Sequence, residues 1–203
     1  MAARKKEGDI LWRSGLLQIF ISHFCHDKDF IYGPRGFKSA QEMNETIIST
    51  WNRLIKPDDD VYVLGDMFVG GTKTPIEVAQ NLIGSLRGRI HIVRGNHDTE
   101  TKLAAYKKCR NVAEIENAIF LDYRGYHFYL SHFPTITYTW TSKKKELCRM
   151  SINLCGHTHI KDPFFDFDKG PIFHCEWDTL GRPWMLDEAI DSIVEGAHRY
   201  GRV

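Results

Sequence analysis

The sequence predicts a layered α/β fold with a mixed sheet, and three observations support this fold class. Short apolar runs typical of buried strands alternate with segments whose apolar residues recur at helical spacing. Strand-like runs outnumber helices in the later part of the chain, which favours mixed rather than purely parallel sheets. Polar clusters directly follow several of the strand-like runs, at the strand ends where α/β proteins bind ligands.

The length of 203 residues suits one α/β domain with a sizeable core. No repeat, low-complexity tract or linker rich in Pro, Gly and Ser divides the chain. We therefore treat residues 1–203 as a single domain, in which residues 1–17 form an N-terminal extension.

The first elements are predicted by an apolar run and a capping motif. Residues 18–22 (QIFIS) are typical of a buried strand. Ser39 and Glu42 have the spacing of a capping box, so we expect a helix to begin there and to end before Pro57. Residues 61–64 form the second predicted strand, which leads into a Gly-Asp pair.

The same logic predicts the next helix and strand. Thr74 and Glu77 form a second capping box, and Gly88 is the expected end of the helix that follows. Residues 89–93 form the third predicted strand, which runs directly into the motif GNHD.

The second half of the chain is richer in strands. Residues 119–123 and 126–131 flank an Arg-Gly pair and predict a hairpin. Residues 152–155 and 172–175 are two further short strands, and a final helix begins at Asp187.

Four polar motifs stand at the ends of predicted strands, in the order GD, GNHD, SHFP and GHTH, at residues 65–66, 95–98, 131–134 and 156–159. Mixed oxygen and imidazole donors of this kind suit Zn, Mn, Fe or Ni better than Ca or Mg. An Asp at a strand end can bridge two cations, and two cations about 3.5–4 Å apart can clamp both oxygens of an in-line phosphoryl displacement.

This ordered set resembles the motifs of the calcineurin-like metallophosphoesterases, in particular their small bacterial and phage-type members, over about residues 18–190. The resemblance implies a four-layer α/β/β/α sandwich with mixed sheets. It also implies a dinuclear centre that holds two divalent transition-metal ions, such as Mn²⁺, Fe²⁺, Zn²⁺ or Ni²⁺.

The resemblance also implies the role of each site residue. Asp66 would bridge both metals; Asn96, His132 and His157 would bind one metal, and His159 the other. The catalytic residues would be His97 and Asp98. His97 would stabilise or protonate the leaving oxygen of the substrate, and Asp98 would orient its imidazole.

The first motif departs from the family pattern, in which the first strand ends in Asp-x-His. Residues 21–27 read ISHFCHD, with no Asp after Ser22. If two residues are deleted, His23 is the retained histidine and the Asp ligand is lost. Without a gap, His23 replaces the Asp and Cys25 replaces the histidine. We favour the gapped alignment, which keeps the pattern His-Phe-x-His and makes His23 the metal ligand of this motif.

Arg35 is a further candidate residue, because it lies in the loop formed by residues 33–36. There it either reaches the metal cleft and binds a substrate phosphate through two parallel hydrogen bonds, or forms part of a structural turn.

The composition excludes several classes of function. The 27 Lys and Arg residues and 26 Asp and Glu residues give a net charge of +1, whereas nucleic-acid and membrane-surface binders carry a basic excess. We therefore expect a small phosphate-ester substrate and neither a nucleic-acid nor a membrane partner. The 5 cysteines are scattered without a CxxC pair, which indicates free thiols and a cytoplasmic location.

The leading hypothesis is a metal-dependent phosphoesterase that hydrolyses a phosphomonoester or phosphodiester by attack of a metal-bound hydroxide. The rival hypothesis is a degenerate family member that acts as a metal-binding scaffold or interaction protein without hydrolase activity. The missing Asp of the first motif favours the rival, which would keep an intact second metal site without hydrolysing any phosphoester.

Overall fold

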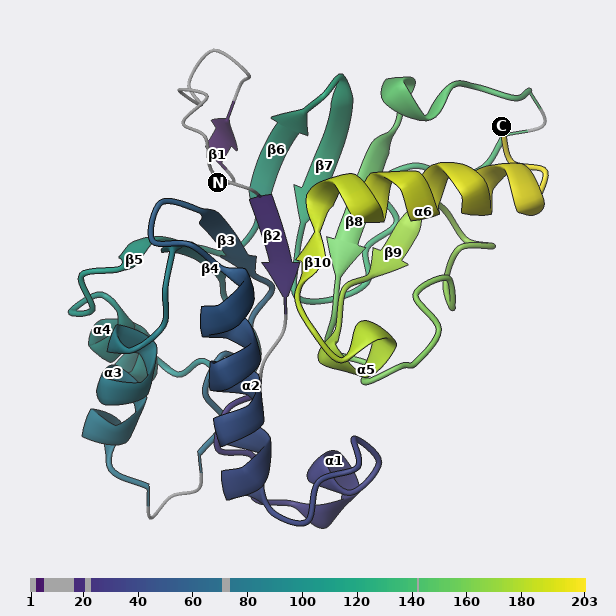
Figure 1. Ribbon diagram of the computed structural model, residues 1–203. Coiled ribbons are helices and arrows are strands. Elements are labelled where there is room, and N and C mark those ends of the chain that lie inside the picture. Colours follow the sequence, from purple (N-terminus) through teal and green to yellow (C-terminus); the bar gives the residue numbers. More distant parts are fainter. Residues whose placement is uncertain (1–2, 6–16, 21–22, 71–73, 142) are drawn as a thin grey trace.

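A computed structural model of the chain describes residues 3–5, 17–20, 23–70, 74–141 and 143–203. Its strands form two five-stranded sheets, and helices lie along the outside of both (Figure 1). The first predicted strand covers residues 18–22, and its last two residues, 21 and 22, lie outside the described residues.

The first sheet has the strand order β10-β2-β3-β4-β5. Its members are β2 (Leu17–Phe20), β3 (Asp60–Val63), β4 (Arg89–Val93), β5 (Val112–Glu116) and β10 (Trp184–Met185). Strands β2 to β5 are parallel, whereas β10 runs antiparallel to β2. The carboxyl ends of β2, β3 and β4 therefore meet at one edge of the sheet.

The second sheet has the strand order β1-β6-β7-β8-β9. Its members are β1 (Ala3–Lys5), β6 (Ile119–Tyr123), β7 (Tyr126–Leu130), β8 (Ser151–Cys155) and β9 (Ile172–His174). Strands β6 and β7 form the predicted antiparallel hairpin, and the remaining pairs are parallel. Strand β1 belongs to the segment that we expected to be an N-terminal extension.

The longer helices cover the outer faces of the sheets (Figure 1). Helices α2 (Ala40–Leu54), α3 (Ile76–Gly84) and α4 (Glu100–Tyr106) lie beside the first sheet, and α6 (Leu186–Arg199) lies along the second. The short helices α1 (Asp29–Tyr32) and α5 (Trp177–Leu180) and the 3₁₀ turn η1 (Leu147–Arg149) lie in the connections.

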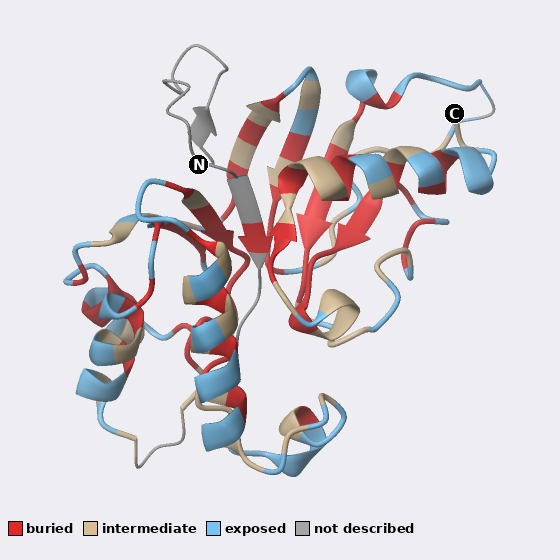
Figure 2. Ribbon diagram, in the orientation of Figure 1, coloured by how far each residue is buried: buried red, intermediate tan, exposed pale blue. Residues whose placement is uncertain are grey.

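Strand β3 shows why the layers form. Val61 and Val63 belong to the core cluster that contains the apolar residues of α2 and α3. Tyr62 and the adjacent Leu64 belong to the cluster that joins both sheets and α6, in which they share the interior with Leu130. Successive side chains of a strand point to opposite faces, so one strand contributes to both cores. The four-layer α/β/β/α sandwich is confirmed, and Figure 2 shows the buried residues concentrated on the strands.

The capping prediction for α2 is confirmed. Ser39 is its N-cap, and the Ser39 hydroxyl accepts a hydrogen bond from the backbone nitrogen of Glu42 at 3.1 Å. The Glu42 carboxylate reaches back to the backbone nitrogen of Lys38 at 2.7 Å, which is one residue before the cap. The helix ends at Leu54, before Pro57.

The capping prediction for α3 is wrong. The helix begins at Ile76 after Pro75 as N-cap, and no side chain caps it, so Thr74 and Glu77 do not form a capping box. It ends at Gly84 rather than at Gly88, which instead adopts a φ of 94° in the turn before β4.

Among the described residues, no helix combines the length and the apolar character needed to cross a membrane.

Candidate metal centre

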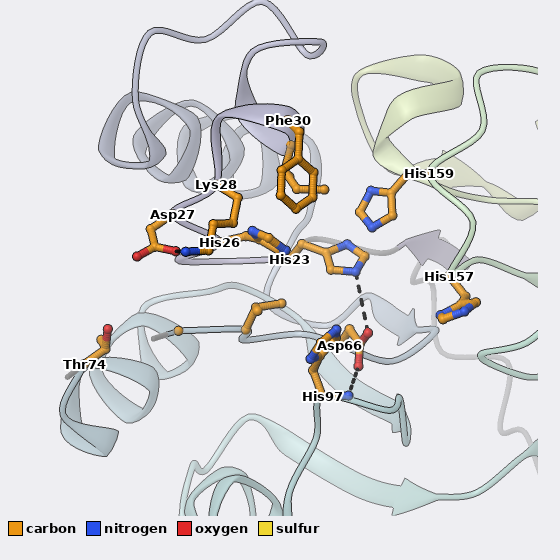
Figure 3. Close-up of a pocket in the computed structure, with 13 residues that line it drawn as sticks. His23, His26, Asp27, Lys28, Phe30, Asp66, Thr74, His97, His157 and His159 are labelled. Atoms are coloured by element: carbon orange, nitrogen blue, oxygen red, sulfur yellow. Dashed lines mark hydrogen bonds and ion pairs between the residues drawn. The ribbon is translucent and has the colours of Figure 1, made fainter. Parts of the chain in front are cut away.

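The residues that the sequence predicts as ligands meet at one edge of the two sheets. His23 follows β2, Asp66 follows β3, Asn96 and His97 follow β4, His132 follows β7, and His157 and His159 follow β8. A cavity of about 730 Å³ opens there and is lined by His23, Asp66, His97, His157 and His159, among others (Figure 3). The fold therefore brings together side chains from both sheets.

One group of candidate metal ligands, called a half-site below, is centred on the buried side chain of His132. Its Nε2 atom lies 2.8 Å from Asn96 Oδ1, 3.1 Å from His157 Nδ1 and 3.3 Å from Asp66 Oδ2. The donor atoms of Asp66, His132 and His157 all lie within 4.8 Å of one another. Ligands about 2.1 Å from one ion lie roughly 3 Å from each other, so this set fits a divalent transition metal.

The tautomer of His132 suits this role. Its Nδ1 atom lies 2.8 Å from the backbone carbonyl oxygen of Leu64, which can only accept a hydrogen bond. The proton therefore sits on Nδ1, and Nε2 offers a lone pair to the half-site. A hydrogen bond of this kind also fixes the ring orientation of a metal ligand.

The charges around Asp66 indicate a site built for a cation. Burial disfavours the charged form of Asp66, but the adjacent imidazoles of His132 and His23, whose Nε2 atoms lie 3.3 and 3.7 Å from its Oδ2, outweigh burial and lower the pKa of the carboxyl group. Burial likewise opposes a charge on His132, but the neighbouring Asp66 carboxylate raises its pKa overall. A proton on His132 thus compensates the carboxylate when no metal does so.

A second group of candidate ligands, called the other half-site below, contains His23, His159 and again Asp66. His23 Nε2 lies 3.7 Å from Asp66 Oδ2, and the rings of His23 and His159 are 4.3 Å apart between centroids. His23 is 3% exposed, and its Nδ1 atom has no hydrogen-bond partner among the described residues. Burial lowers the pKa of His23 to about 4. A neutral imidazole with an orphaned nitrogen, beside a carboxylate and a second imidazole, fits a metal ligand.

Cys25 contacts Asn44 of α2 through both its backbone and its thiol. Its backbone nitrogen donates to Asn44 Oδ1 at 2.9 Å, and its thiol sulfur accepts from Asn44 Nδ2 at 3.3 Å. The thiol is thus engaged with α2, whereas His23, His26 and Asp27 of the first motif line the cavity.

The structure corrects the expected role of Asp98. This carboxylate does not hydrogen-bond to His97; it accepts from the backbone nitrogens of Asp66 and Gly95, both at 2.8 Å, and from the Tyr106 hydroxyl at 3.0 Å. It is 1% exposed, and burial raises its pKa. Asp98 therefore joins the loops after β3 and β4 rather than orienting the imidazole of His97.

His97 is exposed at the cavity, beside Asp66. Its backbone nitrogen donates to Asp66 Oδ1 at 2.7 Å, and its backbone carbonyl accepts from the Lys102 ammonium at 2.9 Å. Figure 3 shows its side chain next to Asp66, on the opposite side of that carboxylate from His157. The backbone of His97 is thus fixed while its imidazole faces the cavity.

Backbone conformation reflects the demands of the site. Asp66, His157, His159 and His23 all have positive φ values of 49°, 78°, 54° and 53°. Such conformations are unfavourable for residues other than glycine and cluster at functional sites. Position 95 requires a glycine, because a Cβ atom there would collide with the side chain and backbone nitrogen of Asp66.

A buried carboxylate that the sequence analysis missed holds the GHTH loop. Glu176 Oε1 accepts from the backbone nitrogen and hydroxyl of Thr158, at 2.8 and 2.9 Å, and its Oε2 accepts from the backbone nitrogen of Ile160 at 2.6 Å. His174 supports the same loop through the Thr158 hydroxyl at 3.1 Å. These contacts fix the chain on both sides of His159.

Comparison with known protein sequences gives three findings. The profile of the calcineurin-like phosphoesterase superfamily domain matches residues 43–172. An uncharacterized protein of Methanocaldococcus jannaschii is 35% identical over 118 residues, which are 58% of this chain and 58% of the archaeal protein. The Gene 66 protein of Mycobacterium phage L5 is 28% identical over 181 residues, covering 78% of this chain and 87% of the phage protein.

A solved structure shares the fold. The crystal structure of a protein of unknown function from Aquifex aeolicus superposes with a TM-score of 0.64 at 18% identity, over 87% of this chain and 98% of that one. The chain therefore covers nearly the whole length of the Aquifex protein. It matches less than two thirds of the length of the archaeal relative.

Proposed function

The chain belongs to the calcineurin-like phosphoesterase superfamily, and from this premise we propose that it hydrolyses a small phosphomonoester or phosphodiester at a dinuclear metal centre. The observation that carries the proposal is the convergence on His132 Nε2 of Asn96 Oδ1 and Asp66 Oδ2, at 2.8 and 3.3 Å. Acceptor atoms of this kind repel one another unless a cation or a proton lies between them.

Two sets of ligands share one carboxylate in this proposal. Asp66, Asn96, His132 and His157 would hold one divalent transition metal, and Asp66, His23 and His159 would hold the other. When bound, such ions polarise the phosphoryl oxygens and lower the pKa of the attacking water. With Asp66 as the shared carboxylate, such a centre would keep a positive charge that attracts a phosphate ester, although the chain as a whole has a net charge of only +1.

His97 is suited to act on the leaving group. Its imidazole is exposed to the cavity and its backbone is anchored to Asp66 Oδ1 at 2.7 Å. An imidazole at this place donates a proton to, or a hydrogen bond toward, the leaving oxygen as negative charge develops there. Asp98 supports this geometry indirectly, by holding the loop that carries His97.

The test combines metal analysis with hydrolysis assays on an aryl phosphate and on a bis-aryl phosphodiester, with Mn²⁺, Fe²⁺, Zn²⁺ or Ni²⁺ supplied. We expect two metal equivalents per chain and turnover of one of the esters. His97→Ala should keep its metals and lose about 10²-fold or more in kcat, whereas Asp66→Ala should lose both metals. His127→Ala, in an exposed strand position paired with Asp122, is the matched control and should match the wild type.

A second candidate function is a metal-binding scaffold or interaction protein without hydrolase activity. The observation that favours it is the composition of the half-site of His23 and His159, which lacks the carboxylate found at that motif in the family. One tight metal equivalent and no hydrolysis of either ester with any of the metals would support this candidate and contradict the enzyme.

A further inference from the structure

A buried pair formed by Arg35 and Asp178 lies against the imidazole of His159. Arg35 Nε and Nη2 donate to the two carboxylate oxygens of Asp178, at 2.9 and 2.7 Å. The side chains are only 2% and 7% exposed. Asp178 lies on α5 and Arg35 in the loop before α2, so the pair ties two distant segments together behind the GHTH loop. The bidentate contact shows that Arg35 is committed to Asp178 rather than to a substrate phosphate.

The two members of the pair make opposite demands on His159. Its Nδ1 atom lies 3.5 Å from Asp178 Oδ2 and 3.4 Å from Arg35 Nη2. A carboxylate can only accept a hydrogen bond, which requires a proton on Nδ1 and leaves the Nε2 lone pair free. A guanidinium can only donate, which requires a bare Nδ1 and places the proton on Nε2. Only the first tautomer can bind a metal through Nε2.

We propose that Asp178 is a positioning residue that selects the Nδ1-protonated tautomer of His159, against the competing donor Arg35, and thereby enables the half-site of His23 and His159 to hold its metal. The inference rests on the proposed dinuclear centre. A carboxylate behind a metal-bound histidine fixes its tautomer and raises its basicity. This role matters here because the first motif supplies the imidazole of His23 but not the carboxylate of the family pattern.

The proposal also explains how negative charge reaches this half-site. The described ligands supply one carboxylate, Asp66, which the two ions would share. Asp178 lies outside the cavity lining, yet its charge acts on the metal through the imidazole of His159. Arg35 offsets part of that charge, so its removal should not weaken metal binding in the way that removal of Asp178 does.

The first experiment compares Asp178→Asn with the wild type by metal titration of the metal-free protein. Two equivalents bound by the wild type are expected, and fewer would count against the dinuclear proposal itself. Asp178→Asn should then bind one equivalent with unchanged affinity and the other about 10- to 100-fold more weakly. The retained equivalent at His132 reports that the variant is folded. Two unchanged equivalents in Asp178→Asn would overturn the inference alone.

The second experiment separates tautomer selection from a merely structural role. Arg35→Met keeps an unbranched apolar stem but removes the competing donor, so it should bind both equivalents at least as tightly as the wild type. Equal losses in Arg35→Met and Asp178→Asn would show that the pair only braces the loop, and would overturn the proposal. If Asp178→Asn fails to fold, Arg35→Met decides alone: two equivalents bound at wild-type affinity or tighter support the proposal, and a weakened second equivalent contradicts it.

A direct measurement and a matched control complete the test. The ¹⁵N chemical shifts of His159 should report a proton on Nδ1 in the metal-loaded wild type, and a bare Nδ1 there would contradict the proposal. Asp60→Asn is the matched control, because Asp60 has the same kinds of partner. It accepts two hydrogen bonds from Arg89, at 2.9 and 2.5 Å, and one of its oxygens lies 2.7 Å from a ring nitrogen of His91. Asp60 lies at the amino end of β3, away from the candidate metal centre. It should bind both metals as the wild type does.

Discussion

The Asp98 carboxylate accepts a hydrogen bond of 2.8 Å from the backbone nitrogen of Asp66, 32 residues earlier in the chain. The same oxygen accepts from the backbone nitrogen of Gly95. One buried side chain therefore sets the distance between the loop that carries Asp66 and the loop that carries Asn96 and His97.

Asp98→Asn should destabilise the protein by roughly 3 kcal/mol, because the bonds from the two backbone nitrogens lose their charge assistance and an amide NH2 replaces the oxygen that accepts from the Tyr106 hydroxyl. Chemical denaturation measures the change. Tyr106→Phe removes only the hydroxyl that donates to Asp98 at 3.0 Å and should cost about 1 kcal/mol. The exposed Asp191→Asn serves as control, and a loss in Asp98→Asn no larger than that of the control would contradict this role.

Gly95→Ala should abolish tight metal binding, since the new methyl group would occupy the space of the Asp66 side chain and backbone nitrogen. Gly84→Ala is the matched control. A Cβ atom at Gly84 meets nothing within 4 Å, and its φ is not positive, so alanine there should leave metal content unchanged and add up to about 1 kcal/mol of stability. Metal analysis of both purified variants gives the answer, and two equivalents bound to Gly95→Ala would refute the steric argument.

The sequence predicts the layers and most of the residues that meet at the candidate site, because these depend on local patterns. Apolar runs identify β3, β4 and β8, and the motif that follows each run identifies Asp66, Asn96 and His157. Helix α4 and strand β5 are missed for a physical reason. Strand β5 carries Glu114 and Glu116 and lies at the edge of its sheet, so it lacks an apolar run. Helix α4 is too short for a periodic signal.

The supporting carboxylates of the site are beyond sequence reasoning because their roles arise from tertiary contacts. Glu176 and Asp178 lie in a segment without a recognised motif, and only folding brings them behind the GHTH loop. Asp98 shows the complementary case: the motif GNHD identifies the residue, but the hydrogen bonds of the folded chain determine that it holds two loops rather than orienting His97.

Glu176→Gln should weaken both metal sites, since it replaces an acceptor of three hydrogen bonds by a group with one amide acceptor and one donor. The GHTH loop would then lose its anchor at Thr158 or at Ile160. We expect a cost of about 2–3 kcal/mol and a fall in metal affinity, measured by thermal unfolding and metal titration. Glu195→Gln, in an exposed pair with Arg199, is the control. A Glu176→Gln variant with wild-type affinity at both sites would show that the anchor is dispensable.

In the metal-free protein, the contribution of His23 to the free energy of unfolding should fall as the solution is acidified. The pKa of His23 is about 4 in the folded state against an ordinary value of 6.5, because burial disfavours the imidazolium. The unfolded chain therefore binds more protons between these values, so this contribution is complete above pH 6.5 and is lost as the pH falls toward 4. The difference between the two pKa values corresponds to about 3 kcal/mol.

His23→Gln should remove this contribution, so that its free energy of unfolding changes less between pH 7 and pH 4 than that of the wild type. His132 contributes with the opposite sign, because its raised pKa stabilises the folded state at acid pH; the comparison of His23→Gln with the wild type isolates His23. His127→Gln, which replaces an exposed imidazole, should follow the wild-type profile. Denaturant titration of the metal-free proteins at each pH measures the free energy of unfolding. If this free energy changes with pH in the same way for His23→Gln and the wild type, His23 is not held as a neutral imidazole.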